Sequence, residues 1–377
     1  MLDAGRSNAT PVEDAGVPPR RDATTLDAAL TTLVISPAGA LTVDALAPQP
    51  IQFTAKLSSG ASSSLALSWT SSPRELGSID GATGMFMPSG VGGVLRVTSS
   101  AGGLSASVVV DLLARVVREG DPNFGMAAIG AGGSGGVGGE GGGGMVSDPA
   151  LRAALDAPAQ DDPSLTWLYP YQGTVWPRGL PAPLLQWRNG DHGPRAIKLH
   201  ITVDDKFDGT LYLGPPMGVT RALDRLPIPQ AVWSSALRSG RTMKVAMSYA
   251  ASDGAGGYRT FKLPVELSWT IAPTTLKGTV YYNSYGTKLA ENYNGAKGGN
   301  GRFGGATLAI EGGAFDPKLA AGSTTMDASG CRVCHTVSSD GSTLIALRND
   351  GMQASIYDLA ARSERALPGT DYGKFGW

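Results

Sequence analysis

Both cysteines of this 377-residue chain lie three positions apart, and a histidine directly follows the second. The stretch reads Cys331, Arg332, Val333, Cys334, His335, which is the CxxCH pattern of covalent c-type haem attachment. Two thiols at this spacing can each form a thioether with one vinyl group of the haem, and the adjacent imidazole can reach the iron as proximal ligand. The sequence therefore predicts haem c bound through Cys331 and Cys334, with His335 as the metal ligand.

Other uses of the motif compete with haem attachment. A structural zinc site needs four ligands, and the only other histidines, His192 and His200, are far upstream, so the sequence disfavours zinc. A thioredoxin-like redox pair needs a helix that starts at the motif, whereas residues 336–342 favour a turn and a strand. Redox-active thiols and a local disulfide between Cys331 and Cys334 remain open.

Charge and composition exclude several classes of partner. The net charge is -1 and 17% of the residues are charged, so there is no basic field to hold nucleic acid or an anionic membrane. No apolar run approaches the roughly eighteen residues of a membrane span. The 53 glycines and 25 prolines suit short strands joined by many turns rather than helical bundles. We expect an all-β protein of two or three domains, without a nucleic-acid partner or a transmembrane segment.

No catalytic constellation is visible. His192 falls in a turn, His200 falls on the polar face of an alternating strand, and His335 belongs to the motif. No Ser/His/Asp arrangement can be built from these positions. No catalytic residue is therefore assigned, and whether the chain is an enzyme stays open.

The first thirty residues are predicted to be a disordered tether. The N-terminus lacks the basic and apolar regions of an export signal, and Asp-Ala-Gly occurs at residues 3–5 and again at 14–16 among Pro, Arg, Ser and Thr. Such a stretch cannot bury a core. It looks like the tether behind the lipidated cysteine of bacterial surface lipoproteins. That resemblance implies an export signal upstream of Met1 and an extracytoplasmic location, in the periplasm or on the outer-membrane surface.

Residues 31–113 are predicted to form a β-sandwich. Leu65, Leu67 and Trp69 alternate with small or polar residues, and Ala106, Val108 and Val110 alternate with Ser105 and Ser107, which is the period of half-buried strands. A Trp-Thr-Ser-Ser strand, an Ile-Asp-Gly turn and a closing Ser-Ala-Ser-Val-Val-Val strand follow one another in an order that resembles bacterial Ig-like domains. This resemblance implies a spacer whose Trp69 lies in the core.

A Gly-rich linker is predicted over 114–162, because eleven of the fifteen residues from 130 to 144 are glycine and no Lys-Ser/Thr follows them as a phosphate-binding loop requires. Residues 163–272 contain two clearly alternating strands, near residues 200 and 266. Their Pro-rich opening before Trp187 resembles fibronectin type III or Ig-like modules. We therefore expect a second sandwich, with His200 exposed.

A β-rich connector of unclear role is predicted over 273–330, and 331–377 is predicted to carry the motif into one propeller blade. Ser-Ser-Asp-Gly at 338–341, followed by an Ile-Tyr strand near residue 357, resembles a repeat of the TolB-type (WD40-like) β-propeller family. One blade cannot bury its faces alone. We therefore expect the propeller to be truncated here, with Leu344, Ala346 and Ile356 exposed.

The whole arrangement resembles bacterial, often myxobacterial, extracytoplasmic proteins in which an Ig-like region precedes a CxxCH motif at the start of a propeller. It implies one covalent haem for electron transfer or redox sensing, with a redox partner protein. The alternative is a non-enzymatic adhesion protein that binds cell-surface polysaccharide, with the CxxC as a local disulfide. The sixth iron ligand stays unassigned between Met326, Met352 and a residue outside the chain.

Overall fold

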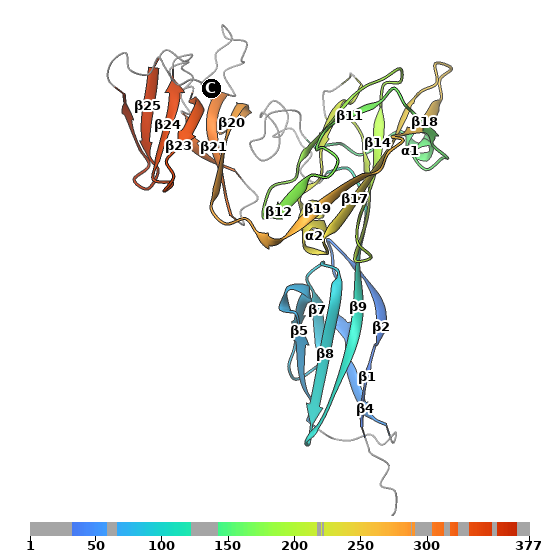
Figure 1. Cartoon of the computed structure of the whole chain (residues 1–377). Helices are drawn as coiled ribbons and strands as arrows, with labels where there is room; N and C mark the ends of the chain where they lie inside the picture. Colours follow the sequence, from blue (N-terminus) through green and yellow to red (C-terminus); the bar gives the residue numbers. More distant parts are fainter. Residues whose placement is uncertain are drawn as a thin grey trace, which may run out of the picture.

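Strands dominate the computed structural model, which describes residues 32–58, 66–121, 142–216, 220, 222–287, 289–290, 304–312, 317–322, 332–348 and 353–367. The α-helices within these ranges are short, so the all-β prediction is confirmed. Figure 1 shows three groups of strands along the chain. No helix in the described ranges is long and apolar enough to cross a membrane.

The first group is a β-sandwich of short strands separated by turn residues. Its strands are β1 (Leu33–Ser36), β2 (Gly39–Asp44), β3 (Ile51–Gln52), β4 (Thr54–Leu57), β5 (Ser68–Ser72), β6 (Gly77–Ile79), β7 (Met85–Pro88), β8 (Gly93–Ala101) and β9 (Leu104–Glu119), with a 3-10 turn at Arg74–Leu76. β8 and β9 form a hairpin flanked by β5 and β2, and β3, β7 and β6 form a separate small sheet. Trp69 is 4% exposed, which confirms that it is a core residue.

Strand β9 continues past the predicted end of the first sandwich. Residues 114–119 pair in parallel with β15 (Phe207–Leu213) of the second group. Ala114 and Val116 are buried, so the inward alternation of the first sandwich simply carries on. The segment 114–162, predicted as linker, therefore contains the end of β9, the helix α1 (Pro149–Ala154) and β10 (Gln160–Asp161). Most of its glycine run lies outside the described residues.

The second group is also a β-sandwich, and helix α2 (Gln230–Arg238) packs on it. Its other strands are β11 (Thr166–Tyr169), β12 (Val175–Arg178), β13 (Leu184–Arg188), β14 (Ala196–Val203), β16 (Arg225–Pro227), β17 (Thr242–Ser252), β18 (Tyr258–Lys262) and β19 (Leu267–Thr275). The rings of Trp176, Trp233 and Trp269 meet edge to face, with centroids 5.2 Å to 6.4 Å apart. Trp233 belongs to α2, so these ring contacts attach the helix to the core of the sandwich.

One hydrophobic core runs through both sandwiches. At the junction the Ala114 N–H donates to the Lys206 carbonyl at 2.9 Å. The Gly92 N–H donates at 3.0 Å to Oγ of Ser239, the residue that directly follows α2. β9 can be followed from the lower sandwich into the upper one in Figure 1. The two sandwiches are thus joined by a shared strand, a shared core and buried hydrogen bonds.

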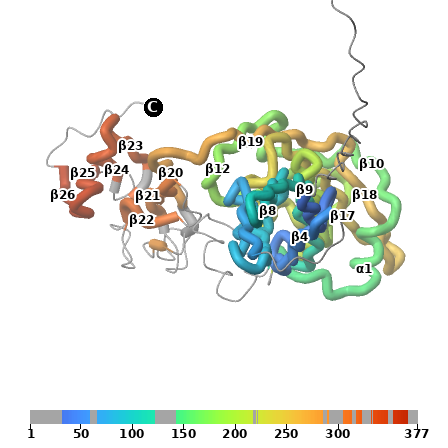
Figure 2. Tube along the Cα trace, turned by 90° about the horizontal axis from the view of Figure 1, so that it is seen from below, coloured from blue at the N-terminus to red at the C-terminus, as the bar shows by residue number. Residues whose placement is uncertain are grey.

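The third group consists of two antiparallel sheets packed on each other, and both views show it beside the sandwiches (Figures 1 and 2). The first sheet holds β20 (Thr279–Thr287), β21 (Gly304–Glu311) and β22 (Lys318–Ala321), and the second holds β23 (Val333–Val337), β24 (Thr343–Arg348), β25 (Gln353–Asp358) and β26 (Ser363–Ala366). The prediction that Leu344, Ala346 and Ile356 stay exposed is wrong: Leu344 and Ala346 are fully buried against Tyr281 and Ala321, and Ile356 is partly buried. The sheet β20–β22, predicted only as a connector, covers Leu344 and Ala346.

Candidate functional site

The CxxCH motif enters strand β23, and Cys334 occupies a β-bulge there. Val333 pairs with Leu347 of β24, but His335 already pairs with the next residue, Ala346. Cys334 is therefore an extra residue on its strand. Its φ of 55° lies in the left-handed region, which costs a residue with a side chain about 1–2 kcal/mol.

This bulge has a direct consequence for the chemistry of the motif. On a regular strand, neighbouring side chains point to opposite faces, so Cys334 and His335 could not approach one flat ligand together. A bulge re-aims the side chain of the extra residue, and backbone strain of this kind clusters at functional sites. The thiol of Cys334 is free and partly exposed. Cys331 lies outside the described residues.

His335 is oriented by two residues of the neighbouring sheet. Its Nδ1 lies 2.8 Å from Oδ1 of Asn283 on β20, and its ring centroid lies 6.4 Å from that of Tyr281 on the same strand. Burial lowers the pKa of His335, although a hydrogen bond to the backbone of Tyr281 acts in the opposite direction. The site therefore favours a neutral imidazole, and a ring that donates from Nδ1 carries its lone pair on Nε2.

The lowered pKa of His335 predicts a pH dependence. Because the folded-state pKa lies below the ordinary value of 6.5, the unfolded chain binds more protons as the pH falls below that value. Stability of the third group should therefore be greatest above pH 6.5 and decrease on acidification. Titration by ¹H–¹⁵N NMR, with His335→Gln to assign the ring, should give a midpoint below 6.5. A midpoint at or above it would contradict the buried, neutral ring.

Arg332, between the two cysteines, fixes the motif to its surroundings. Its side chain is 7% exposed, and its Nε donates to Tyr357 Oη and Glu364 Oε1, each at 2.8 Å. Its backbone N–H donates to the Gly305 carbonyl, and its carbonyl accepts from Thr307 Oγ1. Arg332 thus bonds to both sheets of the third group and holds the start of β23 between them.

The two described ligand residues of the motif, Cys334 and His335, have the chemistry that attachment of a c-type haem requires. Cys334 offers a free, re-aimed thiol, and His335 offers an imidazole held at one nitrogen, as metal-ligating histidines usually are. Within the described ranges no three His, Cys, Asp or Glu side chains gather as a metal site would require. The other two histidines belong to the second sandwich: His200 bonds Asp208 on the exposed face of β14, as predicted, and His192 stacks on Phe261.

Comparisons with known proteins add no function. No family model and no curated protein matches the chain. The chain is similar to crystal structures of Drosophila N-cadherin. The EC1-3 structure is 11% identical, with 63% of this chain and 65% of that chain covered and a TM-score of 0.16. The EC1-4 structure is 11% identical, with 89% and 73% covered and a TM-score of 0.17. The chain thus spans 65% of the length of the first, and a likeness so distant supports no argument.

Proposed function

We propose that this chain carries one covalent c-type haem, bound through thioethers to Cys331 and Cys334 with His335 as proximal ligand, and that it serves electron transfer or redox sensing. The observation that supports this most is the bulge at Cys334 beside a histidine anchored at Nδ1. The bulge interrupts the strict alternation of faces, so the cysteine and the histidine are not required to face opposite ways as on a regular strand.

The residues of the site have separate roles in this proposal. Each thiol adds across one vinyl group, so that sulfur bonds to one carbon and the thiol hydrogen ends on the other, and no atom leaves. Asn283 holds the ring of His335 by its Nδ1, while burial keeps the ring neutral and able to coordinate. Arg332 keeps the start of β23 in place. The bound haem would supply one-electron chemistry.

The same proposal includes an extracytoplasmic location, because covalent haem attachment is normally carried out outside the cytoplasm. The fold supports a propeller-like role for the third group: β23 to β26 follow one another as a four-stranded antiparallel meander, which is the build of one propeller blade. The two sandwiches would act as a spacer, with a lipid-anchored tether ahead of them. A redox partner protein would then meet the third group.

The proposal predicts covalent haem after co-expression with a haem c maturation system in the periplasm. A denaturing gel stained for haem should show a stained band of full length. Cys334→Ser and Cys331→Ser should each weaken the band, and the double variant should abolish it, while His200→Gln, which removes a histidine outside the motif, should leave it unchanged. An unstained parent band, beside a control cytochrome that matures in the same cells, would reject the proposal. A mass lower by two hydrogens would then favour the local disulfide.

A further inference from the structure

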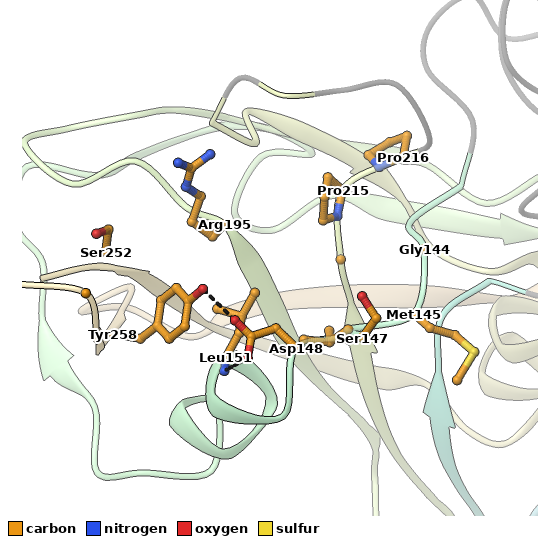
Figure 3. A pocket seen from close by; sticks show the side chains of 14 residues that line it. Gly144, Met145, Ser147, Asp148, Leu151, Arg195, Pro215, Pro216, Ser252 and Tyr258 are labelled. Carbon is orange, nitrogen blue, oxygen red and sulfur yellow. Dashed lines mark hydrogen bonds between the residues drawn. The ribbon is translucent and has the colours of Figure 1, made fainter. Parts of the chain in front are cut away.

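The second sandwich holds a pocket of about 790 Å³ beside helix α1, far along the chain from the CxxCH motif (Figure 3). It lies where the coil leading into α1 meets the turn between β17 and β18, and where β15 ends. The volume is within the usual range for small-molecule sites, which are concave and carry a few polar groups among apolar ones.

Arg195 contributes a guanidinium without an acidic partner to this pocket. Its side chain is exposed, and among the described residues its guanidinium makes a long hydrogen bond of 3.3 Å from Nη1 to the Thr220 carbonyl. Within the described ranges no carboxylate pairs with it, whereas Arg152 and Arg332 each bond to a carboxylate. The remaining donors of Arg195 are therefore available to a planar anion, which a guanidinium binds in a bidentate manner.

A hydrogen-bonded acid lies on the other side of the pocket in Figure 3. Tyr258 Oη donates to Asp148 Oδ2 at 2.7 Å, and Asp148 Oδ1 accepts from the Ala150 N–H. The hydrogen bond from Tyr258 lowers the pKa of Asp148. Asp148 is thus a fixed carboxylate with lone pairs left for hydroxyl donors, and Ser252 adds a hydroxyl of its own at the rim.

The pocket also has an apolar wall. Met145 is 69% exposed and lines the pocket together with Pro215 and Pro216, as Figure 3 shows on the side away from Ser252. A ligand with a hydrated anionic end and an apolar face would use both parts of the site.

Part of the described backbone around the pocket is already paired. Ser252 pairs with Tyr258 in the β17–β18 ladder, and Gly144 bridges Gly214, whose N–H donates to the Gly144 carbonyl at 2.7 Å. Peptides that bind as added strands need free backbone groups. At these paired positions the side chains of Arg195, Asp148 and Ser252 are left to bind a ligand, and their spread around the pocket favours a ligand with hydroxyls around a ring.

We propose that this pocket binds a uronic acid unit of a polysaccharide. The sugar carboxylate pairs with Arg195, ring hydroxyls donate to Asp148 and bond to Ser252, and an apolar ring face lies against Met145 and the prolines. The site is independent of the haem proposal, because no residue of the third group contributes to it.

Calorimetry and ¹H–¹⁵N NMR on the full chain test this, with a short oligogalacturonate as probe. Binding should weaken at least tenfold in Arg195→Gln and in the oligomer whose carboxylates are reduced to alcohols, and it should weaken as salt rises. Arg96→Gln, which removes an exposed arginine of β8 in the first sandwich, is the matched control and should bind like the parent. The shifted amides should include those of Ser252 and Tyr258.

Each opposite result would overturn the proposal. Absence of binding up to the solubility of the probe would reject the site. Equal affinity for the neutral oligomer, or for Arg195→Gln, would reject recognition of the carboxylate. A tripeptide with a free C-terminus that binds more tightly than the oligogalacturonate would replace the saccharide by a peptide.

Discussion

Replacing Gly92 by alanine is expected to destabilise both sandwiches together by about 1–3 kcal/mol. A Cβ at this position would lie 1.8 Å from the Lys206 carbonyl oxygen and 3.0 Å from that of Leu112. The Lys206 oxygen cannot move cheaply, because it accepts a hydrogen bond from the Ala114 N–H of β9. Leu112 is held in the β8–β9 ladder, where it pairs with Gly93. The φ of Gly92 is not in the left-handed region, so steric overlap at the junction is the whole cause.

Urea unfolding followed by circular dichroism and tryptophan fluorescence measures this effect. Gly81→Ala is the matched control in the same sandwich, since its Cβ would meet only the Trp69 carbonyl at 3.7 Å, and its unfolding should match the parent within about 0.5 kcal/mol. Tryptophans of both sandwiches lie in the shared core, so both probes should move together. A variant in which only one sandwich melts early would show that the shared strand does not couple them.

Glu364→Ala is expected to destabilise the third group by about 2–3 kcal/mol, because it removes a carboxylate that is hydrogen-bonded to the buried guanidinium of Arg332. The side chain of Arg332 is 8% exposed, but that of Glu364 is 31% exposed, so water can replace part of the lost interaction and the cost stays below that of a fully buried pair. Burial acts to raise the pKa of Glu364, but hydrogen bonds, Tyr357 among them, and the charge of Arg332 outweigh it and lower the pKa.

Hydrogen exchange read by mass spectrometry resolves this change. Peptides from 332–367 should exchange faster in Glu364→Ala, while those of the sandwiches keep the parental rate. Glu311→Ala is the control, because it breaks an ion pair with Lys318 in which the side chains of Glu311 and Lys318 are 51% and 55% exposed. It should change the exchange rates little, since exposed ion pairs contribute about 0–1 kcal/mol. Equal exchange in both variants would mean that Arg332 does not hold the two sheets together.

The strand pattern of this protein could largely be predicted from its alternating residues, and the errors have specific causes. The predicted boundary at Leu113 is too early, because Leu112, Ala114 and Val116 continue the inward series. The cover over Leu344 came from a β-rich segment whose partner could not be predicted from period alone. Pairing between distant segments is set by packing, which local patterns do not encode.

The candidate site was predictable only in part. The types and spacing of Cys331, Cys334 and His335 give the motif, and the structure describes the last two. Asn283 has no predicted part in it, because it lies 52 residues upstream of His335 and reaches the ring only through the packing of β20 on β23. For Tyr281 the sequence leaves open a place beside a haem but favours a packed edge, and the structure places its ring near that of His335. The bulge at Cys334 has no signal in the sequence, since the residue usually favoured in the left-handed region is glycine.

Intact-mass spectrometry of the denatured, reduced protein after periplasmic maturation tests the central claim most directly. We expect the parent chain to gain the mass of one haem, and the Cys331→Ser, Cys334→Ser double variant to keep the mass of the bare polypeptide. A parent chain at the bare mass, in cells where a control cytochrome gains its haem, would contradict the assignment of this motif to haem c.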